Sequence, residues 1–185
     1  ARPFARKMSE NIGHQVIVDN RGGAGGNIGM EAAARAAPDG YTVVMGLTAQ
    51  LAVNPALFPK IPYDPIRDFE PIMLFANGGY LLVAHPSLPA KTVTDLIAIA
   101  RKRPGELLYA SSGNGSGGHL ASELFNAMAG IRTTHVPYKG GAQAMVDTIA
   151  GQTQLLFTPP ISSAGHVESG RLRAIAVSTT KRLSS

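Results

Sequence analysis

A glycine-rich stretch, residues 111–119, separates an apolar run from a segment with helical periodicity. Residues 107–110 predict a strand, and Leu120, Leu124 and Met128 recur at the spacing of a helix. Such a turn leaves backbone N–H groups pointing beyond the helix N-terminus, where the helix dipole also favours negative charge. We therefore expect an anion-binding loop. A flexible surface loop is the alternative, disfavoured because serine, asparagine and histidine side chains are interleaved with the glycines.

The order strand, loop, helix repeats along the chain and predicts an α/β fold with mostly parallel sheets and right-handed crossovers. We expect a first lobe at residues 1–84, a second at 85–177, and a return toward the first at 178–185. Strands are expected at 15–19, 41–46, 107–110, 133–136, 154–157 and 172–177. Ligands of such folds bind beyond the carboxyl ends of strands, so five loops are expected to line one cleft if the lobes face each other: 20–29, 47–51, 111–119, 137–141 and 158–160.

Composition excludes several classes of protein. The chain of 185 residues is 44% hydrophobic but holds no apolar run long enough to span a membrane. It has no cysteine, which excludes disulfides, thiolate zinc sites and cysteine catalysis. The net charge of +5 is scattered, and the one tight basic cluster, residues 101–103, ends a predicted helix, where cations complement the dipole. We expect a mild preference for anionic ligands and no nucleic-acid binding.

The spacing Gly113-x-Gly115-x-x-Gly118 matches a dinucleotide-binding fingerprint. The acidic residue expected about 20 positions later is missing, because Tyr138 and Lys139 stand there. An NAD(P)- or nucleotide-binding enzyme that uses residues 113–118 as its phosphate loop is kept as the alternative function.

Catalytic and metal-binding patterns are weaker still. The histidines at 14, 85, 119, 135 and 166 show no paired spacing for a metal, and His135 in a strand is expected to be structural. His119 is either a donor to a bound carboxylate or a structural cap, and Lys139 either pairs with an anion or is solvated. No Gly-x-Ser-x-Gly elbow or carboxylate pair is present. Donors without a nucleophile favour binding over catalysis, so no enzyme, metal or cofactor is expected.

Six segments in collinear order, residues 18–29, 37–42, 62–65, 109–116, 135–140 and 172–177, resemble the substrate-binding receptors of tripartite tricarboxylate transporters, the Bug (TctC) family. The resemblance covers essentially the whole chain. It implies a monomeric periplasmic protein with a two-lobed, type II Venus-flytrap fold. Such a receptor captures a small carboxylate, dicarboxylic, tricarboxylic or aromatic, and delivers it to membrane permease subunits without catalysis or cofactor.

The resemblance places carboxylate donors on turns 25–27, 48–49 and 112–118, with selectivity set near 158. Together with the loops above, the predicted ligand-binding residues are Gly25, Gly26, Asn27, Thr48, Ala49, Ser112, Asn114, Ser116, Gly117, His119, Lys139, Gly140 and Thr158. An aspartate often stands in the family where this chain has Thr158. Its absence favours a plain carboxylate over an amino acid.

Two departures from the family pattern matter. Its first strand, with a Pro-Gly-Gly-Thr/Ser-Asp turn, and its long C-terminal portion have no counterpart here. We therefore expect about the central two-thirds of a receptor, with an incomplete first lobe. A fragment that folds poorly and has no independent function is a third hypothesis.

Overall fold

The computed structural model describes residues 1–180, and the chain divides into two compact units, residues 1–71 and residues 72 onward. Each unit is described by itself. The second unit is an α/β domain, as expected from the alternation of strands and helices. The predicted lobes at residues 1–84 and 85–177 stay a prediction, and most of the predicted return segment, residues 178–185, lies outside the described residues. Here strand β1 (Leu81–Ala84) belongs to the sheet of the second unit.

The second unit holds a five-stranded sheet in the order β3-β2-β4-β1-β5. The other strands are β2 (Leu108–Ser111), β3 (Thr134–Pro137), β4 (Leu155–Thr158) and β5 (Arg173–Val177). Strand β2 pairs in parallel with β3 and β4, whereas β1 pairs antiparallel with β4 and β5. Four of the five strands run in the same direction, but both pairings of β1 are antiparallel, so the sheet is mixed rather than purely parallel. Strands β1 and β2 run in opposite directions, so β1 ends at the edge of the sheet where β2 begins. The helix at residues 93–102, which connects them, is therefore not part of a parallel β-α-β crossover.

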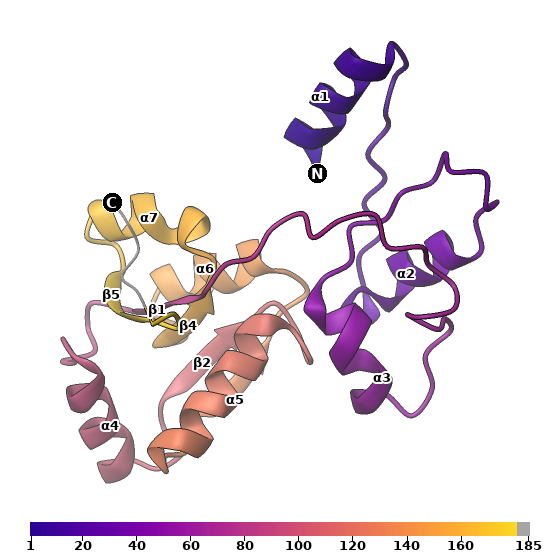
Figure 1. Cartoon of the computed structure of the whole chain (residues 1–185). Helices are drawn as coiled ribbons and strands as arrows, with labels where there is room; N and C mark the ends of the chain where they lie inside the picture. The colour runs from indigo at the N-terminus through magenta and orange to yellow at the C-terminus, as the bar shows by residue number, and fades with distance from the viewer. Residues whose placement is uncertain (181–185) are drawn as a thin grey trace. The chain divides into compact units, whose positions relative to one another are not determined.

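Helices cover both faces of this sheet (Figure 1). Leu82 and Ala84 of β1 pack in one apolar cluster with Leu96, on the face covered by α4 (Val93–Lys102) and α5 (Gly117–Ala129). Val83 points the other way, into a cluster with residues of α6 (Gly141–Ile149) and α7 (Pro160–Glu168). The burial of successive β1 residues on opposite faces explains why the run is continuously apolar.

Local sequence signals determine the helix ends. The Asp95 carboxylate accepts a hydrogen bond from the N–H of Thr92 at 3.0 Å, and the Thr92 hydroxyl accepts from the N–H of Asp95 at 3.1 Å, so the two residues form a capping box. In the first unit, α1 (Arg2–Ile12) ends at Gly13, whose φ of 71° is the left-handed conformation that glycine adopts readily.

The first unit contains α1, α2 (Asn27–Ala34) and α3 (Asn54–Leu57), joined by turns. The strands predicted at 15–19 and 41–46 are wrong for this structure, because both runs lie outside any sheet. Ile17 is 80% exposed and Tyr41 is 93% exposed. A strand needs a neighbour for its backbone hydrogen bonds, and the described part of this unit offers no segment that pairs with either run.

Candidate ligand-binding site

The carboxyl ends of three parallel strands meet at one edge of the second unit's sheet. Ser111 of β2 lies opposite Pro137 of β3, and the start of β1, Leu81, lies opposite Thr158 of β4. The segments at these strand ends are called here the carboxyl-edge loops. They are residues 112–118 after β2, residues 138–141 after β3, and residues 158–159, which begin with the last residue of β4. They bring together these predicted site residues of the second unit: Ser112, Asn114, Ser116, Gly117, Lys139, Gly140 and Thr158. The remaining one, His119, lies in the first turn of α5.

The glycine-rich loop is held by its own hydrogen bonds. The N–H of Gly113 donates to the Ser111 hydroxyl oxygen at 3.1 Å, and the N–H of Ser116 donates to the carbonyl of Gly113 at 3.1 Å. Gly113 has φ 123° and Gly115 has φ 75°, conformations that a side chain disfavours strongly. The loop is therefore an ordered turn, and its glycines are required by the backbone path.

The start of α5 carries N–H groups that no described residue accepts, although Gly118 itself is buried. Ser116 caps the helix by accepting from the N–H of His119 at 3.4 Å. In residues 1–180 no acceptor is found for the N–H groups of Gly117 and Gly118, as expected at a helix N-terminus. A side chain at Gly117 would overlap the hydroxyl of Tyr80, so that phenol lies against the same turn. Sequence reasoning missed Tyr80, whose only signal was its place after Gly78–Gly79.

The remaining predicted residues at this edge differ in exposure. Ser112, Asn114 and Lys139 are exposed, whereas Thr158 is buried. The turn after β3 runs beside the glycine-rich loop, because the N–H of Tyr138 donates to the Ser111 carbonyl at 3.0 Å. Exposed hydroxyl, amide and ammonium groups are suitable partners for a carboxylate.

His119 supports the glycine-rich loop. Its Nδ1 accepts the N–H of Gly115 at 3.1 Å, so the ring proton of the neutral form sits on Nε2. His119 therefore has a structural role in the loop, one of the two roles predicted for it from the sequence. Its Nε2–H remains as the donor of the ring. Contact with a ligand through that nitrogen stays a prediction.

A cluster of aromatic and imidazole rings lies next to this loop. The His135 ring stacks on Tyr109 with centroids 4.8 Å apart and on His119 with centroids 4.2 Å apart. Tyr109 donates to Glu123, and burial, followed by this carboxylate, raises the pKa of Tyr109. Burial, followed by the neighbouring His119, lowers the pKa of His135 to about 4. His135 is therefore neutral at pH 7.

Ser111 and His135 form a contact with the geometry of a nucleophile and base, since Ser111 Oγ lies 2.6 Å from His135 Nε2. Ser111 is fully buried, so no substrate reaches its hydroxyl. Of the carboxylates described, none hydrogen-bonds His135, and Glu123 is bound to Tyr109 instead. The pair therefore lacks both the access and the orienting acid of a hydrolytic site.

The predicted residues of the first unit surround a buried polar centre. Asn27 Oδ1 lies 2.6 Å from Asn54 Nδ2 and 2.9 Å from the Tyr63 hydroxyl. Gln50 Nε2 donates to the carbonyl of Gly25 at 2.6 Å. These bonds join the turn that contains Gly25, Gly26 and Asn27 to the turn that contains Thr48 and Ala49. Thr48 and Gly25 are exposed, whereas Asn27 and Ala49 are buried.

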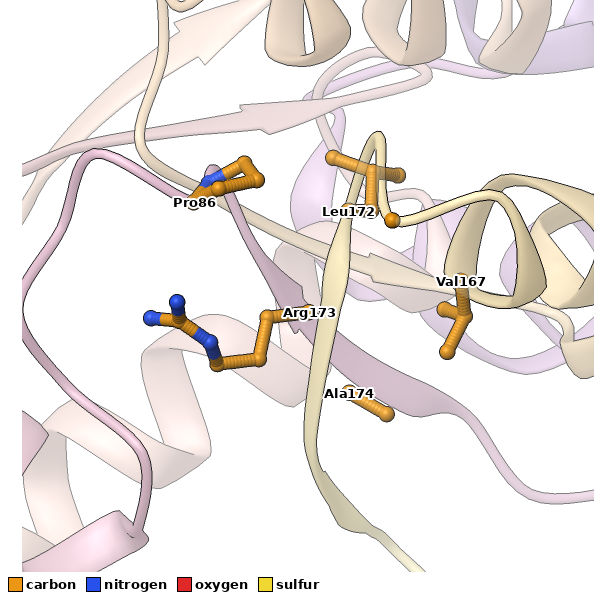
Figure 2. A pocket seen from close by; sticks show the side chains of 6 residues that line it. Pro86, Val167, Leu172, Arg173 and Ala174 are labelled. Carbon is orange, nitrogen blue, oxygen red and sulfur yellow. The ribbon is translucent and has the colours of Figure 1, made fainter.

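A separate hollow of about 350 Å³ lies at the opposite edge of the second unit's sheet (Figure 2). Pro86, Val167, Leu172 and Ala174 line it together with Gly170 and Arg173. One guanidinium nitrogen of Arg173 donates to the carbonyls of Leu88 and Ala90, at 3.0 and 3.1 Å. Much of this hollow is apolar, and none of the residues predicted to bind ligand lies in it.

The second unit is an α/β domain with polar loops at one edge of its sheet, and comparison with known proteins identifies the family of the chain. All residues from 1 to 185 match the model of the tripartite tricarboxylate transporter family receptor, TctC, so the chain belongs to this family of transport receptors. It is 40% identical over 182 residues to the UPF0065 protein in the tcbD-tcbE intergenic region of Pseudomonas sp. strain P51, covering 98% of this chain and 54% of that protein.

Solved structures agree with this assignment. R. palustris Rpa4515 with adipate is 40% identical with a TM-score of 0.94, over 98% of this chain and 60% of that one. MatC (Rpa3494) from Rhodopseudomonas palustris with bound malate is 27% identical with a TM-score of 0.91, over 98% of this chain and 62% of that one. The chain thus spans between half and two-thirds of the length of these proteins.

No helix within residues 1–180 is long and apolar enough to cross a membrane.

Proposed function

We propose that this chain is part of an extracytoplasmic receptor that captures a small carboxylate for a tripartite tricarboxylate-type transporter. The observation that carries the proposal is the similarity, over 98% of the chain, to structures described with adipate and with malate. Both ligands are dicarboxylates. Membrane permease subunits are the proposed partners, the periplasm is the proposed location, and the receptor is proposed to act as a monomer.

The carboxyl-edge loops supply suitable chemistry for this role. The available donors are the exposed side chains of Ser112 and Asn114 and the ammonium of Lys139. The backbone N–H groups of Gly117 and Gly118 are donors as well. Each charge-assisted hydrogen bond to a carboxylate contributes about 1.5–3 kcal/mol before ordering costs. The turns with Gly25, Gly26, Asn27, Thr48 and Ala49 are proposed as a second set of donors, and Ser116, His119, Gly140 and Thr158 complete the first set.

Calorimetric titration with adipate and malate tests the proposal, with the neutral diamide of adipate as the control for charge. We expect saturable binding of the acids and none of the diamide. Ser112→Ala combined with Asn114→Ala should weaken binding about tenfold, since two donors are lost. Thr94→Ala, on the exposed surface of α4, should leave binding unchanged. Absence of binding to either acid would contradict the proposal.

A fluorescence titration with NADPH separates the alternative of a nucleotide-binding enzyme. The receptor proposal expects no saturable change, because no acidic residue follows β3 to hold a ribose hydroxyl. Saturable quenching that is lost with Gly113→Ala would favour the nucleotide site.

A further inference from the structure

The Ser111 hydroxyl has three polar contacts, and two of them compete for its single proton. Its oxygen accepts the N–H of Gly113 at 3.1 Å and also lies 3.1 Å from the Gly113 carbonyl and 2.6 Å from His135 Nε2. A hydroxyl has a single proton, so Ser111 donates either to the carbonyl or to the imidazole. The proton position on His135 decides which contact forms.

Only one arrangement satisfies all three contacts. If His135 carries its proton on Nε2, the ring donates to Ser111, and Ser111 donates to the Gly113 carbonyl. If Nε2 carries no proton, the Ser111 hydroxyl must donate to Nε2, and the hydrogen bond from Ser111 to the Gly113 carbonyl is lost. In the Nε2–H form the buried Ser111 hydroxyl makes all three hydrogen bonds, one more than in the other form, so the geometry favours the Nε2–H form.

We propose that His135 and Ser111 are a positioning pair for the ligand site: His135 holds the Ser111 hydroxyl, which holds both polar groups of Gly113 and thereby the loop 112–116. The ligand-binding consequence rests on the function proposed above. The Gly113 carbonyl also accepts the N–H of Ser116, so the pair acts on the residue that caps α5. Ser112 and Asn114, on either side of Gly113, are oriented by the same peptide groups.

The groups around His135 keep this arrangement in place at neutral pH. On β2, Tyr109 stacks on the ring and Ser111 bonds it. On α5, His119 also stacks on the His135 ring, and Glu123 is bound by Tyr109. Burial and the proximity of His119 both oppose a charge on His135, so its neutral form persists.

Nuclear magnetic resonance of the ¹⁵N-labelled chain tests the pair without any ligand. The ring nitrogens of His135 should show the Nε2–H tautomer at pH 7. The glutamine amide of His135→Gln replaces the Nε2 donor, whereas His135→Phe keeps a stacking ring and removes the donor. We expect hydrogen exchange of the Gly113 amide to rise about tenfold in His135→Phe and in Ser111→Ala, and to stay within about threefold of the parent in His135→Gln.

Adipate titration of the same variants provides the functional readout. Affinity should fall about tenfold in His135→Phe and be retained in His135→Gln. The surface pair His85 and Ser87, joined by a 2.7 Å contact, is the matched control, so His85→Phe and Ser87→Ala should change neither measurement.

The outcomes separate this inference from the proposed function. An Nδ1–H tautomer for His135 overturns the positioning pair, as does equal Gly113 exchange in the Phe and Gln variants. If the parent chain binds no adipate but the exchange pattern is as expected, the proposed function fails while the pair's hold on the loop stands. The tautomer is measured on the parent chain, so it tests the inference even if a variant fails to fold.

Discussion

Gly118 of helix α5 lies directly against the carbonyl oxygen of Phe157 on strand β4. A Cβ atom built on Gly118 would sit 2.6 Å from that oxygen, closer than real contacts allow. The helix that begins at the candidate site therefore packs on the sheet at a distance that only glycine permits. The contact belongs to the same edge at which Thr158 ends β4.

The first prediction follows from this contact. Gly118→Ala should reduce the free energy of unfolding by about 1–3 kcal/mol, because the obstructing atom is backbone and cannot move aside. Thermal and urea unfolding followed by circular dichroism measure the loss. Gly165→Ala in α7 is the matched control, since its Cβ would meet no atom within 4 Å. That change should be neutral or stabilising by up to about 1 kcal/mol. Equal effects of the two substitutions would show that the contact is not restrictive.

A second prediction concerns the start of α4. Thr92→Ala removes the hydroxyl that accepts from the N–H of Asp95 and should destabilise the second unit by about 1 kcal/mol. Thr94→Ala, an exposed position in the first turn of the same helix, is the control and should have little effect. The difference in unfolding midpoint between the two variants is the measurement. No difference would mean that the capping box contributes nothing to stability.

Features determined by nearby residues were predictable from the sequence. These features depend on residues only a few positions away in the sequence. They are the capping box at Thr92, the ends of α1 and α6, and the loop before α5. The antiparallel direction of β1 relative to β4 and β5 was not predictable. It depends on how the chain connects β1 to β2, which local sequence signals do not specify. The runs at 15–19 and 41–46 carry strand-like composition, but pairing requires a partner that periodicity cannot supply.

At the candidate site, the sequence identified the glycine-rich loop but missed its support. Ser111 and His135 are 24 positions apart and meet only because β2 pairs with β3 in the register that sets Tyr109 opposite His135. Tyr80 lies against the loop from the position just before β1, a strand on the other side of β4. Contacts of this kind follow from strand order and register, which a single sequence does not specify.

A third prediction addresses the buried polar centre of the first unit. Tyr63→Phe removes the hydroxyl that lies 2.9 Å from Asn27 Oδ1 and 2.8 Å from the Gln50 carbonyl. The loss should cost about 1–2 kcal/mol, because these acceptors lie in a largely buried setting. Hydrogen exchange of the turn at residues 24–27 should accelerate accordingly.

Tyr41→Phe is the control for this change, because Tyr41 is 93% exposed and its hydroxyl is solvated. Its exchange pattern and unfolding midpoint should match those of the parent chain. If Tyr63→Phe behaved in the same way, the polar centre would not be what joins the two turns.

The last prediction is a dependence of stability on pH. The pKa of His135 is lowered from 6.5 to about 4 in the folded chain, first by burial and then by His119. Above pH 6.5 the ring is neutral in both the folded and the unfolded chain and contributes nothing. Between pH 6.5 and about 4 the unfolded chain binds a proton that the folded chain does not, so the free energy of unfolding falls as the pH falls.

The loss should reach about 1–2 kcal/mol near pH 4, less than the full shift would give, because the ring is partly exposed and solvent screens its charge. Unfolding midpoints measured from pH 7.5 to 4 should decline less steeply in His135→Gln, whose amide does not titrate. His14→Gln serves as the control for removing a histidine, since His14 is exposed. Parallel pH profiles for the parent chain and His135→Gln would show that His135 does not carry this dependence.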